Sequence, residues 1–366
     1  MDSAPPELQA VIERIRASAR DSTPLRIRGG GSKDFYGGPL AGETLELSSL
    51  RGISSYEPSE LVVTVRAGTP LVELEAVLAE QGQCLPFEPP HFGGTASGTV
   101  GGMVAAGLSG PARASVGAVR DYVLGASMIN GRGELLTFGG QVMKNVAGYD
   151  VSRVLAGSLG VLGVITELSL KVLPVAPAQA TLAFQCTQAE ALHRLNAWGG
   201  QPLPLNASCW AEQDSQGWLY LRLRGAVAAV EAACRQLGGE RVDAAQAAAS
   251  WQALRDQQLP FFSERAAGQE LWRLSVPQTA PVLALDATPV VEWHGGQRWY
   301  VLPRGRAQQV RAAAHAAGGH ATLFARDEAD RQAAAFDVLS PPLQKIHDAL
   351  KREFDPQGLF NPGRLF

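Results

Sequence analysis

The sequence predicts an α+β protein of two domains. The first half of the chain is rich in glycine, whereas the second half alternates helix-like and strand-like segments with few glycines, as in an antiparallel sheet covered on one side by helices. Pro174 and Pro177 mark the change, and 366 residues suffice for two domains with a substantial core. The expected divisions are residues 1–176, an α+β domain at 177–340, and a helix and tail at 341–366 that return to the first domain.

Apolar spacing and turn residues predict the elements of the first domain. Thr69 is expected to cap a helix that has Pro70 at its first position and ends near Gly82. The alternation over 164–172 predicts a long, half-buried strand. The other expected elements are a helix of about 15 residues after Pro5-Pro6, strands at 25–28, 44–47 and 61–66, and a hairpin of 121–129 and 134–138 around an Asn-Gly turn.

The second domain is predicted from the same signals. Strands are expected at 181–186, 205–210, 218–223, 271–276, 290–293, 299–302 and 321–324, and helices at 188–197, 227–237, 307–317 and 343–354. The Ala/Gln-rich run 246–258 predicts a surface helix. The final residues, 355–366, combine aromatic side chains with proline and glycine, so we expect this tail to dock rather than fray.

Composition excludes several classes of function. The formal net charge is −3 and no long basic run is present, which argues against nucleic acid as a partner. No apolar run approaches the roughly 20 residues that cross a bilayer, and the N-terminus lacks the layout of a signal peptide. Four scattered cysteines, at 84, 186, 209 and 234, do not suit a metal or an iron–sulfur cluster. We therefore expect a cytoplasmic protein with no transmembrane segment and no resident metal.

The stretch Gly93–Gly110, GGTASGTVGGMVAAGLSG, holds seven glycines. Glycine costs backbone entropy, so this density indicates a backbone that takes positive φ or closely approaches a flat or phosphorylated cofactor. Glycine-rich stretches are also often flexible linkers. Against that alternative, Val100, Met103, Val104 and Leu108 form an apolar stripe at helical spacing.

A second glycine cluster, Arg28–Lys33 or RGGGSK, follows the predicted strand 25–28. Successive backbone N–H groups in such a loop can converge on one anion, and Ser32, Arg28 and Lys33 add a hydroxyl and positive charge. One interpretation is a diphosphate cradle; the other is a glycine-rich hairpin turn. The loop is neither a Walker A motif nor the GxGxxG of a Rossmann unit.

Four segments in this order carry a resemblance to a known family. They are RGGGSK at 28–33, GTVGGMVAAGLSG at 98–110, NVAGYDVSRVLAGSLGVLGVIT at 145–166 and DPQGLFNPG at 355–363. Together they resemble the FAD-binding fold of the vanillyl-alcohol oxidase and p-cresol methylhydroxylase (PCMH) type. Within it, and with WHGGQRW at 293–299, the chain resembles the glycolate oxidase/D-lactate dehydrogenase branch and most of all the glycolate oxidase E-subunit family.

The resemblance implies a PCMH-type domain whose two subdomains hold FAD, and an α+β cap domain over the flavin. It implies that the cradle carries the pyrophosphate and that other backbone and polar groups line the rest of the cofactor. The cofactor-binding residues that it implies are Arg28, Gly29, Gly30, Gly31, Ser32, Lys33, Pro89, Ser97, Thr99, Gly101, Gly102, Gly160, Gly163, Val164, Ile165 and Asn361.

The chain departs from the family pattern at two places. Covalent members carry His beside the first loop or Cys near the second, where Ser32 and Ser97 stand here, so we expect non-covalent FAD. Catalytic subunits of this branch carry a metal-binding His-x-His, which is absent from this sequence, and their Asn-Ala-Gly-Gly segment reads Gly107-Leu-Ser-Gly110.

The resemblance implies a FAD-binding subunit of a glycolate oxidase or dehydrogenase complex. The complex would oxidise a 2-hydroxy acid, glycolate or D-lactate, to the 2-oxo acid by hydride transfer to flavin. The implied partners are a homologous FAD subunit and an iron–sulfur subunit, through which the chain could lie at the periphery of the inner membrane. The first alternative, from another functional class, is a non-catalytic assembly or electron-relay subunit of that complex. The second and weaker alternative is an enzyme like UDP-N-acetylenolpyruvoylglucosamine reductase.

The sequence leaves the catalytic residues open. His294 could be a catalytic base or a packed, hydrogen-bonded side chain. Arg298 could bind a carboxylate or stack on Trp293 or Trp299. Tyr149 and Asp150 could fasten a loop that supports the flavin. Lys144 could be a surface charge, or it could contact the cofactor or the other domain. We assign Trp210, Trp218 and Trp251 to the core or interface of the cap.

Overall fold

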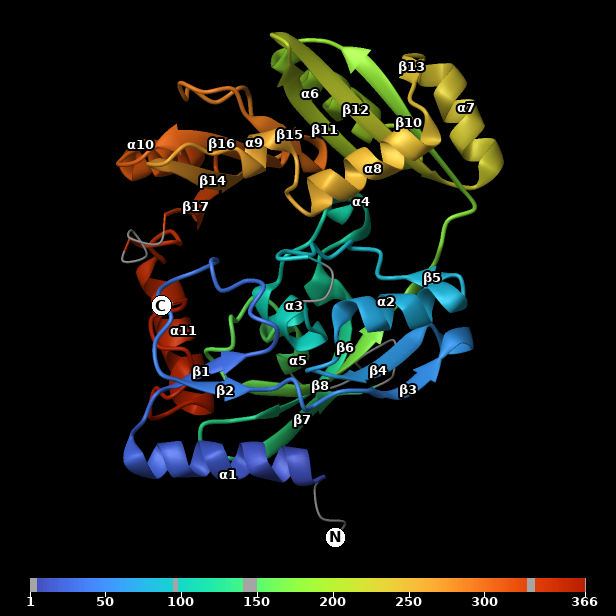
Figure 1. Cartoon of the computed structure of the whole chain (residues 1–366). Coiled ribbons are helices and arrows are strands. Elements are labelled where there is room, and N and C mark those ends of the chain that lie inside the picture. Colours follow the sequence, from blue (N-terminus) through green and yellow to red (C-terminus); the bar gives the residue numbers. More distant parts are fainter. Residues whose placement is uncertain (1–4, 95–97, 141–149, 328–332, 366) are drawn as a thin grey trace.

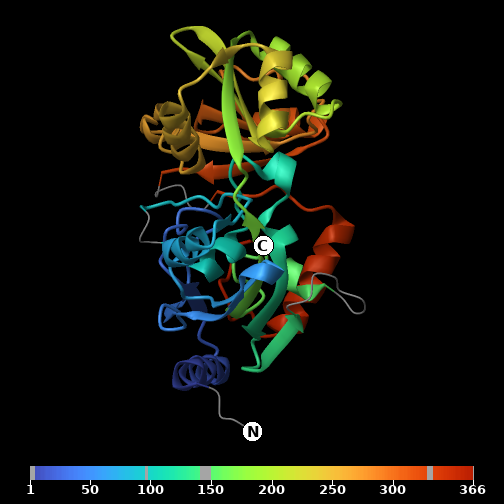
Figure 2. The ribbon, with the colours of Figure 1, turned by 90° about the vertical axis from the view of Figure 1, so that its right-hand side faces the viewer.

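The structure, a computed structural model, describes residues 5–94, 98–140, 150–327 and 333–365. Two domains are stacked, with the first and last segments of the chain in the lower domain of Figure 1 and the second half of the sequence in the upper one. Figure 2 shows the same stacking from the side. Each domain is built on its own sheet, as the expected fold class requires: a mixed α/β domain and an antiparallel sheet domain.

The first domain contains a five-stranded antiparallel sheet of order β3-β4-β8-β6-β7 and a parallel pair, β1 and β2. Its core forms where the apolar faces of α2 and α3 pack against β4, β6 and β8. The bounds are α1 Pro6–Asp21, β1 Leu25–Arg28, β2 Glu43–Glu46, β3 Ile53–Glu57, β4 Val62–Arg66, α2 Leu71–Glu80, β5 Gln83–Cys84, α3 Val100–Ala106, α4 Arg113–Val116, β6 Val123–Ile129, β7 Leu135–Gly139, α5 Val151–Val154, β8 Val164–Lys171 and β9 Leu173–Pro174.

Two local predictions for this domain are wrong. Pro70 is the N-cap of α2, and the hydroxyl of Thr69 instead accepts a hydrogen bond from the Gly52 N–H at 2.9 Å. β8 is more deeply buried than a half-exposed strand because β4 and β6 flank it. Ser169, expected to face water, is buried and shares a 2.9 Å hydrogen bond with Thr64 on β4.

The second domain is an eight-stranded antiparallel sheet of order β13-β10-β12-β11-β15-β16-β14-β17. Helices α6, α7 and α10 cover its outer face. The bounds are β10 Ala178–Gln185, α6 Gln188–Gly199, β11 Leu205–Gln213, β12 Gln216–Gly225, α7 Val227–Leu237, β13 Glu240–Arg241, α8 Ala244–Arg255, α9 Pro260–Ser263, β14 Gln269–Ser275, β15 Val290–Glu292, β16 Gln297–Pro303, α10 Ala307–Ala316 and β17 His320–Ala325.

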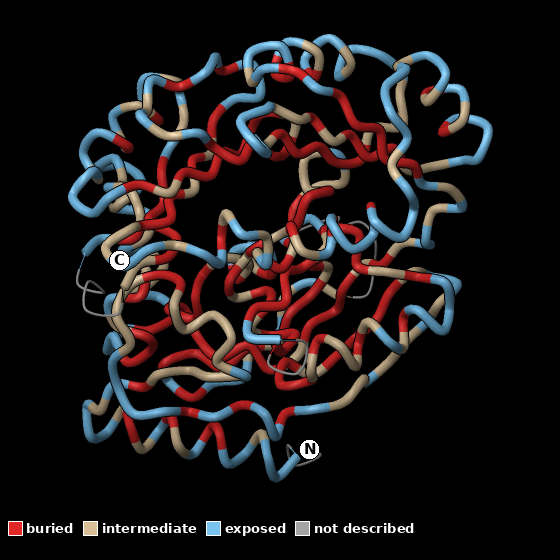
Figure 3. Tube along the Cα trace, turned by 45° about the horizontal axis from the view of Figure 1, so that its top comes forward, coloured by how far each residue is buried: buried red, intermediate tan, exposed pale blue. Residues whose placement is uncertain are grey.

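The inner face of this sheet is turned toward the first domain. One apolar cluster joins Trp299 and Phe324 of the sheet to Tyr36 and Phe92 of the first domain. The predicted surface helix, α8, lies on this inner face and buries Ala247, Trp251 and Leu254 against the sheet, while its glutamines face out. Figure 3 shows buried residues along the strands of both sheets.

The C-terminal segment returns to the first domain, as the sequence predicts. Helix α11, Pro341–Phe354, runs down the side of the molecule in Figure 1. The tail then forms a parallel bridge between Phe360 and Leu25 of β1, and Phe360 is fully buried. The Asp355 carboxylate accepts from the backbone N–H groups of Leu359 and Phe360, which fixes the turn that leads the tail inward.

Candidate functional site

A cavity of about 90 Å³ lies at the end of β1, and we call it the cradle cavity. It brings together segments that are far apart in the sequence: the loop 28–33, the glycine-rich stretch around α3, the turn before β8 and the C-terminal tail. Its lining residues are Arg26, Ile27, Arg28, Gly29, Gly30, Gly31, Ser32, Lys33, Asp34, Leu40, Thr99, Gly102, Ala105, Ala106, Leu159, Asn361 and Arg364.

The backbone of the loop 28–33 requires glycine at two positions. Gly31 has φ +73°, a conformation that L residues rarely adopt. A Cβ on Gly29 would collide with the side chain of Thr99, the N-cap of α3. The loop therefore approaches α3 closely, and only glycine permits that approach.

Lys33 and Arg28 line the cradle cavity, and of the two Lys33 has no counter-charge among the described residues. Lys33 donates to the Ser32 hydroxyl at 3.3 Å and forms no ion pair with the described residues, and burial lowers its pKa to about 8. Arg28 has two carboxylate partners: its Nε lies 3.6 Å from Asp34, just beyond hydrogen-bond distance, and its Nη1 lies 3.3 Å from Glu46. A bound anion would offset the cost of burying these groups. The cavity thus fits a phosphate-bearing ligand.

The tail holds the cradle in place. The side-chain oxygen of Asn361 accepts from the Ile27 N–H at 2.8 Å, and its nitrogen donates to the Leu159 carbonyl at 2.7 Å. The guanidinium of Arg364 donates to the carbonyls of Lys33, Asp34 and Gly38. Asn361 therefore joins β1 to the turn before β8, and Arg364 fixes the far end of the loop.

The other predicted cofactor residues do not line the cradle cavity. Ser97 lies outside the described residues. Gly101 and Gly163 are packing glycines, since a Cβ on either would collide with Ala67 or Met128 respectively. Val164 and Ile165 are buried in β8. Pro89 and Gly160 lie beside residues that do line a cavity, Pro90 and Leu159.

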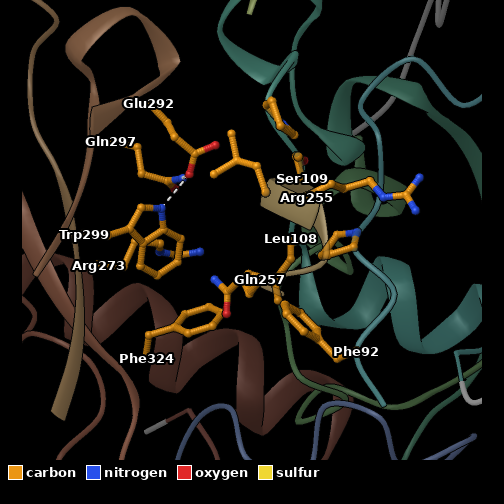
Figure 4. A pocket seen from close by; sticks show the side chains of 14 residues that line it. Phe92, Leu108, Ser109, Arg255, Gln257, Arg273, Glu292, Gln297, Trp299 and Phe324 are labelled. Carbon is orange, nitrogen blue, oxygen red and sulfur yellow. Dashed lines mark hydrogen bonds between the residues drawn. The ribbon is translucent and has the colours of Figure 1, made fainter. Parts of the chain in front are cut away.

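A second cavity lies between the two domains, and we call it the interdomain cavity (Figure 4). It is small: the centres of water molecules can occupy about 30 Å³ of it, which is room for roughly two or three waters. Its lining residues are Pro90, Phe92, Leu108, Ser109, Gly110, Pro111, Leu254, Arg255, Gln257, Arg273, Glu292, Gln297, Trp299 and Phe324. The end of the glycine-rich stretch, Leu108–Gly110, forms its first-domain wall.

Strand register explains the polar residues of the interdomain cavity. Glu292 is paired with Gln297 across β15 and β16, and Trp299 is paired with Arg273 across β16 and β14. Paired residues share a face of the sheet, and so do residues two apart in a strand. All four side chains therefore point from the inner face toward the first domain.

Glu292 is 4% exposed. Its Oε2 accepts from the Trp299 indole N–H at 2.6 Å and from the Gln297 amide at 3.0 Å. Burial raises its pKa to about 7, and the charge of Glu88 adds to the rise, although both hydrogen bonds favour the charged form. Glu292 is thus a carboxyl group that can change its charge near neutral pH.

The two arginines of the interdomain cavity differ. Arg255 forms a bidentate ion pair with Asp256 at 2.8 Å. Arg273 has no carboxylate partner among the described residues: it donates to the Tyr36 hydroxyl at 3.1 Å and lies over the ring of Phe324 at 5.4 Å. Only Arg273 leaves its positive charge available to an anionic ligand.

His294 lies outside the lining of both cavities. Its ring lies 3.1 Å from the Ser208 hydroxyl of β11 and 3.0 Å from the Ser115 hydroxyl of α4, so it bridges the two domains. Burial lowers its pKa to about 4, which keeps the ring neutral near neutral pH. The structure thus places His294 in the packed, hydrogen-bonded role.

Arg298 is fully buried and occupies neither expected role. Its guanidinium donates to the backbone carbonyls of Gly295, Ala280 and Pro281. Register explains this, because Arg298 is paired with Val291 and points to the opposite face from Glu292. Asp150 caps α5, while Tyr149 and Lys144 lie outside the described residues.

Sequence reasoning missed the polar residues Arg273, Glu292 and Gln297 that the second domain contributes to the interdomain cavity. Glu292 directly precedes the WHGGQRW segment, and Gln297 and Trp299 alternate with Arg298 in it. The period-2 alternation of a strand could have assigned Gln297 and Trp299 to one face and Arg298 to the other. Nothing in the sequence shows that this face is turned toward the glycine-rich stretch, because that depends on how the domains stack.

The described ranges contain neither a membrane-spanning helix nor a metal-binding cluster. No helix there is long and apolar enough to span a membrane. No group of three or more His, Cys, Asp or Glu side chains in the same ranges could hold a metal ion.

The fold and the cradle cavity define a FAD-binding flavoprotein. Residues 4–139 match a family model described as a FAD binding domain. Solved structures of alkyldihydroxyacetonephosphate synthase are similar in fold: one has a TM-score of 0.66 at 15% identity and covers 98% of this chain and 76% of its own.

Sequence comparison then gives the family. The chain is 46% identical to glycolate oxidase subunit GlcE of Escherichia coli (strain K12) over 358 residues, which is 98% of this chain and 97% of that protein. The chain therefore belongs to the glycolate oxidase subunit GlcE family.

More distant relatives match only about half of the chain. They include D-lactate dehydrogenase of Anaerostipes hadrus, 32% identical over 46% of this chain and 34% of that protein. Glycolate oxidase subunit GlcD of Bacillus subtilis (strain 168) is 29% identical over 49% of this chain and 38% of its own length.

Proposed function

We propose that this chain is the FAD-binding subunit of a glycolate oxidase complex and oxidises a 2-hydroxy acid, glycolate or D-lactate, to the 2-oxo acid. The observation that carries the proposal is the cradle cavity, where the buried Lys33 of a glycine loop has no counter-charge among the described residues and lies beside the glycine-rich stretch. The 46% identity to a glycolate oxidase subunit supports the choice of substrate class.

We infer that FAD binds without a covalent bond. The cradle Arg28–Lys33 would hold its pyrophosphate, and Thr99, Gly102 and Asn361 would line the same cavity. When bound, FAD supplies a two-electron acceptor for a hydride. The residues of this chain bind and orient it, and the stacked second domain covers the site and excludes water.

The domain division of the sequence is part of the proposal. Residues 1–176 would bind the cofactor, residues 177–340 would cap it, and residues 341–366 would complete the first domain. The bridge between Phe360 and Leu25 supports the last assignment. The interdomain cavity would then be the substrate site, since it lies where the cap meets the glycine-rich stretch.

The proposed partners are a homologous FAD subunit and an iron–sulfur subunit that passes electrons onward. The names of the relatives, glycolate oxidase subunits GlcE and GlcD, support an assembly of several chains. The second candidate function is an electron relay in which the partner flavoprotein oxidises the substrate. It differs from the first in one respect, namely whether substrate reduces the flavin of this chain.

Cofactor binding is tested by the visible spectrum of the purified chain. We expect a yellow protein whose FAD is released on acid precipitation. The variant Gly30→Val is expected to lose FAD, because Gly30 lines the cradle cavity and a branched side chain would occupy the place of the anion. The matched control is Gly199→Val, where a Cβ would meet no atom within 4 Å. A colourless wild type, or a Gly30→Val variant that keeps FAD, would refute the assignment.

The reaction is tested by mixing the FAD-loaded chain with glycolate or D-lactate without oxygen. Bleaching of the flavin in the isolated chain supports the proposal that this chain itself oxidises the substrate. Bleaching of this flavin only after the partner subunits are added supports the electron relay instead.

A further inference from the structure

A carboxyl oxygen of Glu292 is aimed at the interdomain cavity. Both of its hydrogen bonds, from Trp299 and Gln297, end on Oε2. Among the described residues, Oε1 accepts no hydrogen bond, and Figure 4 shows this end of the side chain directed away from Trp299. The two donors hold the carboxylate in one orientation and leave one oxygen for a ligand.

A cation lies on the same face of the sheet. Arg273 is paired with Trp299 in the register of β14 and β16, and Trp299 touches Glu292, so the three side chains form a row. The rings of Tyr36 and Phe324 lie beside the Arg273 guanidinium, at 5.7 and 5.4 Å, and restrict its motion. Arg273 also borders a surface groove of about 740 Å³, so it stands between solvent and the interdomain cavity.

We propose that the interdomain cavity binds a 2-hydroxy carboxylate of two or three carbons, with Arg273 as the anchor of its carboxylate and Glu292 as the acceptor of its hydroxyl proton. This rests on the proposed function. The small volume of the cavity favours such a ligand, and Phe92, Leu108 and Trp299 form the apolar part of its wall.

The step balances with FAD as the oxidant. The hydroxyl proton would move to Oε1 of Glu292, and bound FAD would accept the hydrogen of the α-carbon together with its electron pair. The C–O single bond would become a carbonyl, and the two electrons that the acid loses would be taken up by bound FAD. The proton then passes from Glu292 to solvent, which regenerates the carboxylate.

The charge state of Glu292 suits this role. A general base is most effective when its pKa lies near the working pH, and burial raises the pKa of Glu292 to about 7. The other titratable groups that face it are Glu88, Arg273, the ion pair of Arg255 with Asp256, and Cys209, its partner across β11 and β15. Burial raises the pKa of Cys209 well above its usual value, so this thiol stays neutral.

The test measures binding of oxalate, an unreactive diacid, to the FAD-loaded full chain by calorimetry at several pH values. Oxalate places a carboxylate oxygen where the substrate has its hydroxyl, so it needs a proton on Glu292. In the wild type we expect oxalate affinity to fall about tenfold per pH unit above about pH 7. In Glu292→Gln the affinity is expected to be independent of pH, and Arg273→Met is expected to weaken binding at least about tenfold.

Glu270→Gln is the matched control. Glu270 is a buried carboxyl group of the same sheet that also accepts from an indole, Trp272, at 3.2 Å, but it points to the outer face. We expect this variant to bind oxalate as the wild type does. FAD content and thermal unfolding show that each variant is folded.

The proposal is overturned if the wild type does not bind oxalate, or if Glu292→Gln and Arg273→Met bind it with the wild-type pH dependence and affinity. If glycolate still bleaches the flavin in that case, the proposed function holds and only the assignment of Glu292 and Arg273 is refuted. Failure of glycolate to bleach the flavin, with oxalate binding as expected, would instead refute the enzymatic function.

Discussion

At the scale of single residues, burial raises the pKa of the Glu292 carboxyl group and thereby lowers the stability of the folded chain at neutral pH. The group is buried on an apolar face, and its pKa in the folded chain, about 7, lies above the ordinary value of 4.5. The folded state therefore binds this proton more tightly than the unfolded state does. Stability is lost as pH rises from 4.5 toward 7, and the full penalty is present above about pH 7.

Replacing Glu292 by Gln is expected to remove this penalty, because glutamine keeps the shape and can still accept from Trp299. At about pH 8 the variant is expected to be more stable by up to about 3 kcal/mol, the equivalent of the pKa difference. Below about pH 4.5 the two proteins are expected to be equally stable. Urea unfolding at both pH values measures this. A stability difference that does not change with pH would contradict the assignment.

At the scale of elements, the site depends on a tail that closes the first domain. Asn361 bonds to β1 on one side and to the turn before β8 on the other, and its φ of +43° suits glycine as well as asparagine. The loop 28–33 follows directly from β1. The geometry of the cradle is thus coupled to the final residues of the chain.

The variant Asn361→Gly removes the two side-chain hydrogen bonds and leaves the backbone unchanged, because glycine readily adopts the same backbone conformation. We expect it to destabilise the chain by roughly 2–4 kcal/mol, since two buried backbone groups lose their partners, and to weaken FAD binding. Urea unfolding and FAD titration measure the two effects. Asn196→Ala, a change on the outer helix α6, is the control and is expected to keep FAD affinity. Unaltered FAD affinity in Asn361→Gly would show that the hydrogen bonds of the tail do not control the geometry of the cradle.

At the scale of the whole molecule, a buried ion pair joins the two domains. Glu88 of the first domain accepts two 2.7 Å hydrogen bonds from Arg222 of β12, and the Arg222 side chain is 4% exposed. Asn206 and the ring of Trp251 complete its surroundings. Together with His294, this pair fixes the cap over the glycine-rich stretch and so sets the shape of the interdomain cavity.

Glu88→Gln is expected to leave the buried Arg222 without its counter-charge and to cost roughly 3 kcal/mol of stability. Hydrogen exchange is expected to increase on both sides of the domain interface. The control is Glu231→Gln, which breaks a more exposed ion pair with Arg241 and is expected to cost less than about 1 kcal/mol. Equal effects of the two changes would mean that the interface does not depend on the Glu88 pair.

The sequence predicts local features of this molecule better than features that depend on how distant segments and the two domains pack together. Helical and strand periodicity located α7 and the β6–β7 hairpin, and the glycines of 28–33 pointed to an anion site. The local pattern predicts Thr69 as a cap because it does not show the true partner of the Thr69 hydroxyl, which is the Gly52 backbone N–H of another loop. Likewise, α8 seemed a surface helix from its composition, whereas the second sheet provides its cover.

The candidate site divides in the same way. The cradle is one short segment with its own chemistry, so its residues could be named from the sequence. The interdomain cavity combines Glu292 and Arg273 with Leu108 and Phe92, and no local pattern joins these positions. Their proximity follows from strand register and from the ion pair and rings that join the domains.

The rate of flavin reduction by glycolate, measured without oxygen over a range of pH, tests most directly whether the interdomain cavity is the substrate site. In the FAD-loaded wild type we expect the rate to rise about tenfold per pH unit up to about pH 7 and then to level off, because Glu292 must be deprotonated to accept the proton. In Glu292→Gln the rate is expected to be low and independent of pH. A wild-type rate that does not vary with pH, or a Glu292→Gln variant with the wild-type profile, would contradict this account.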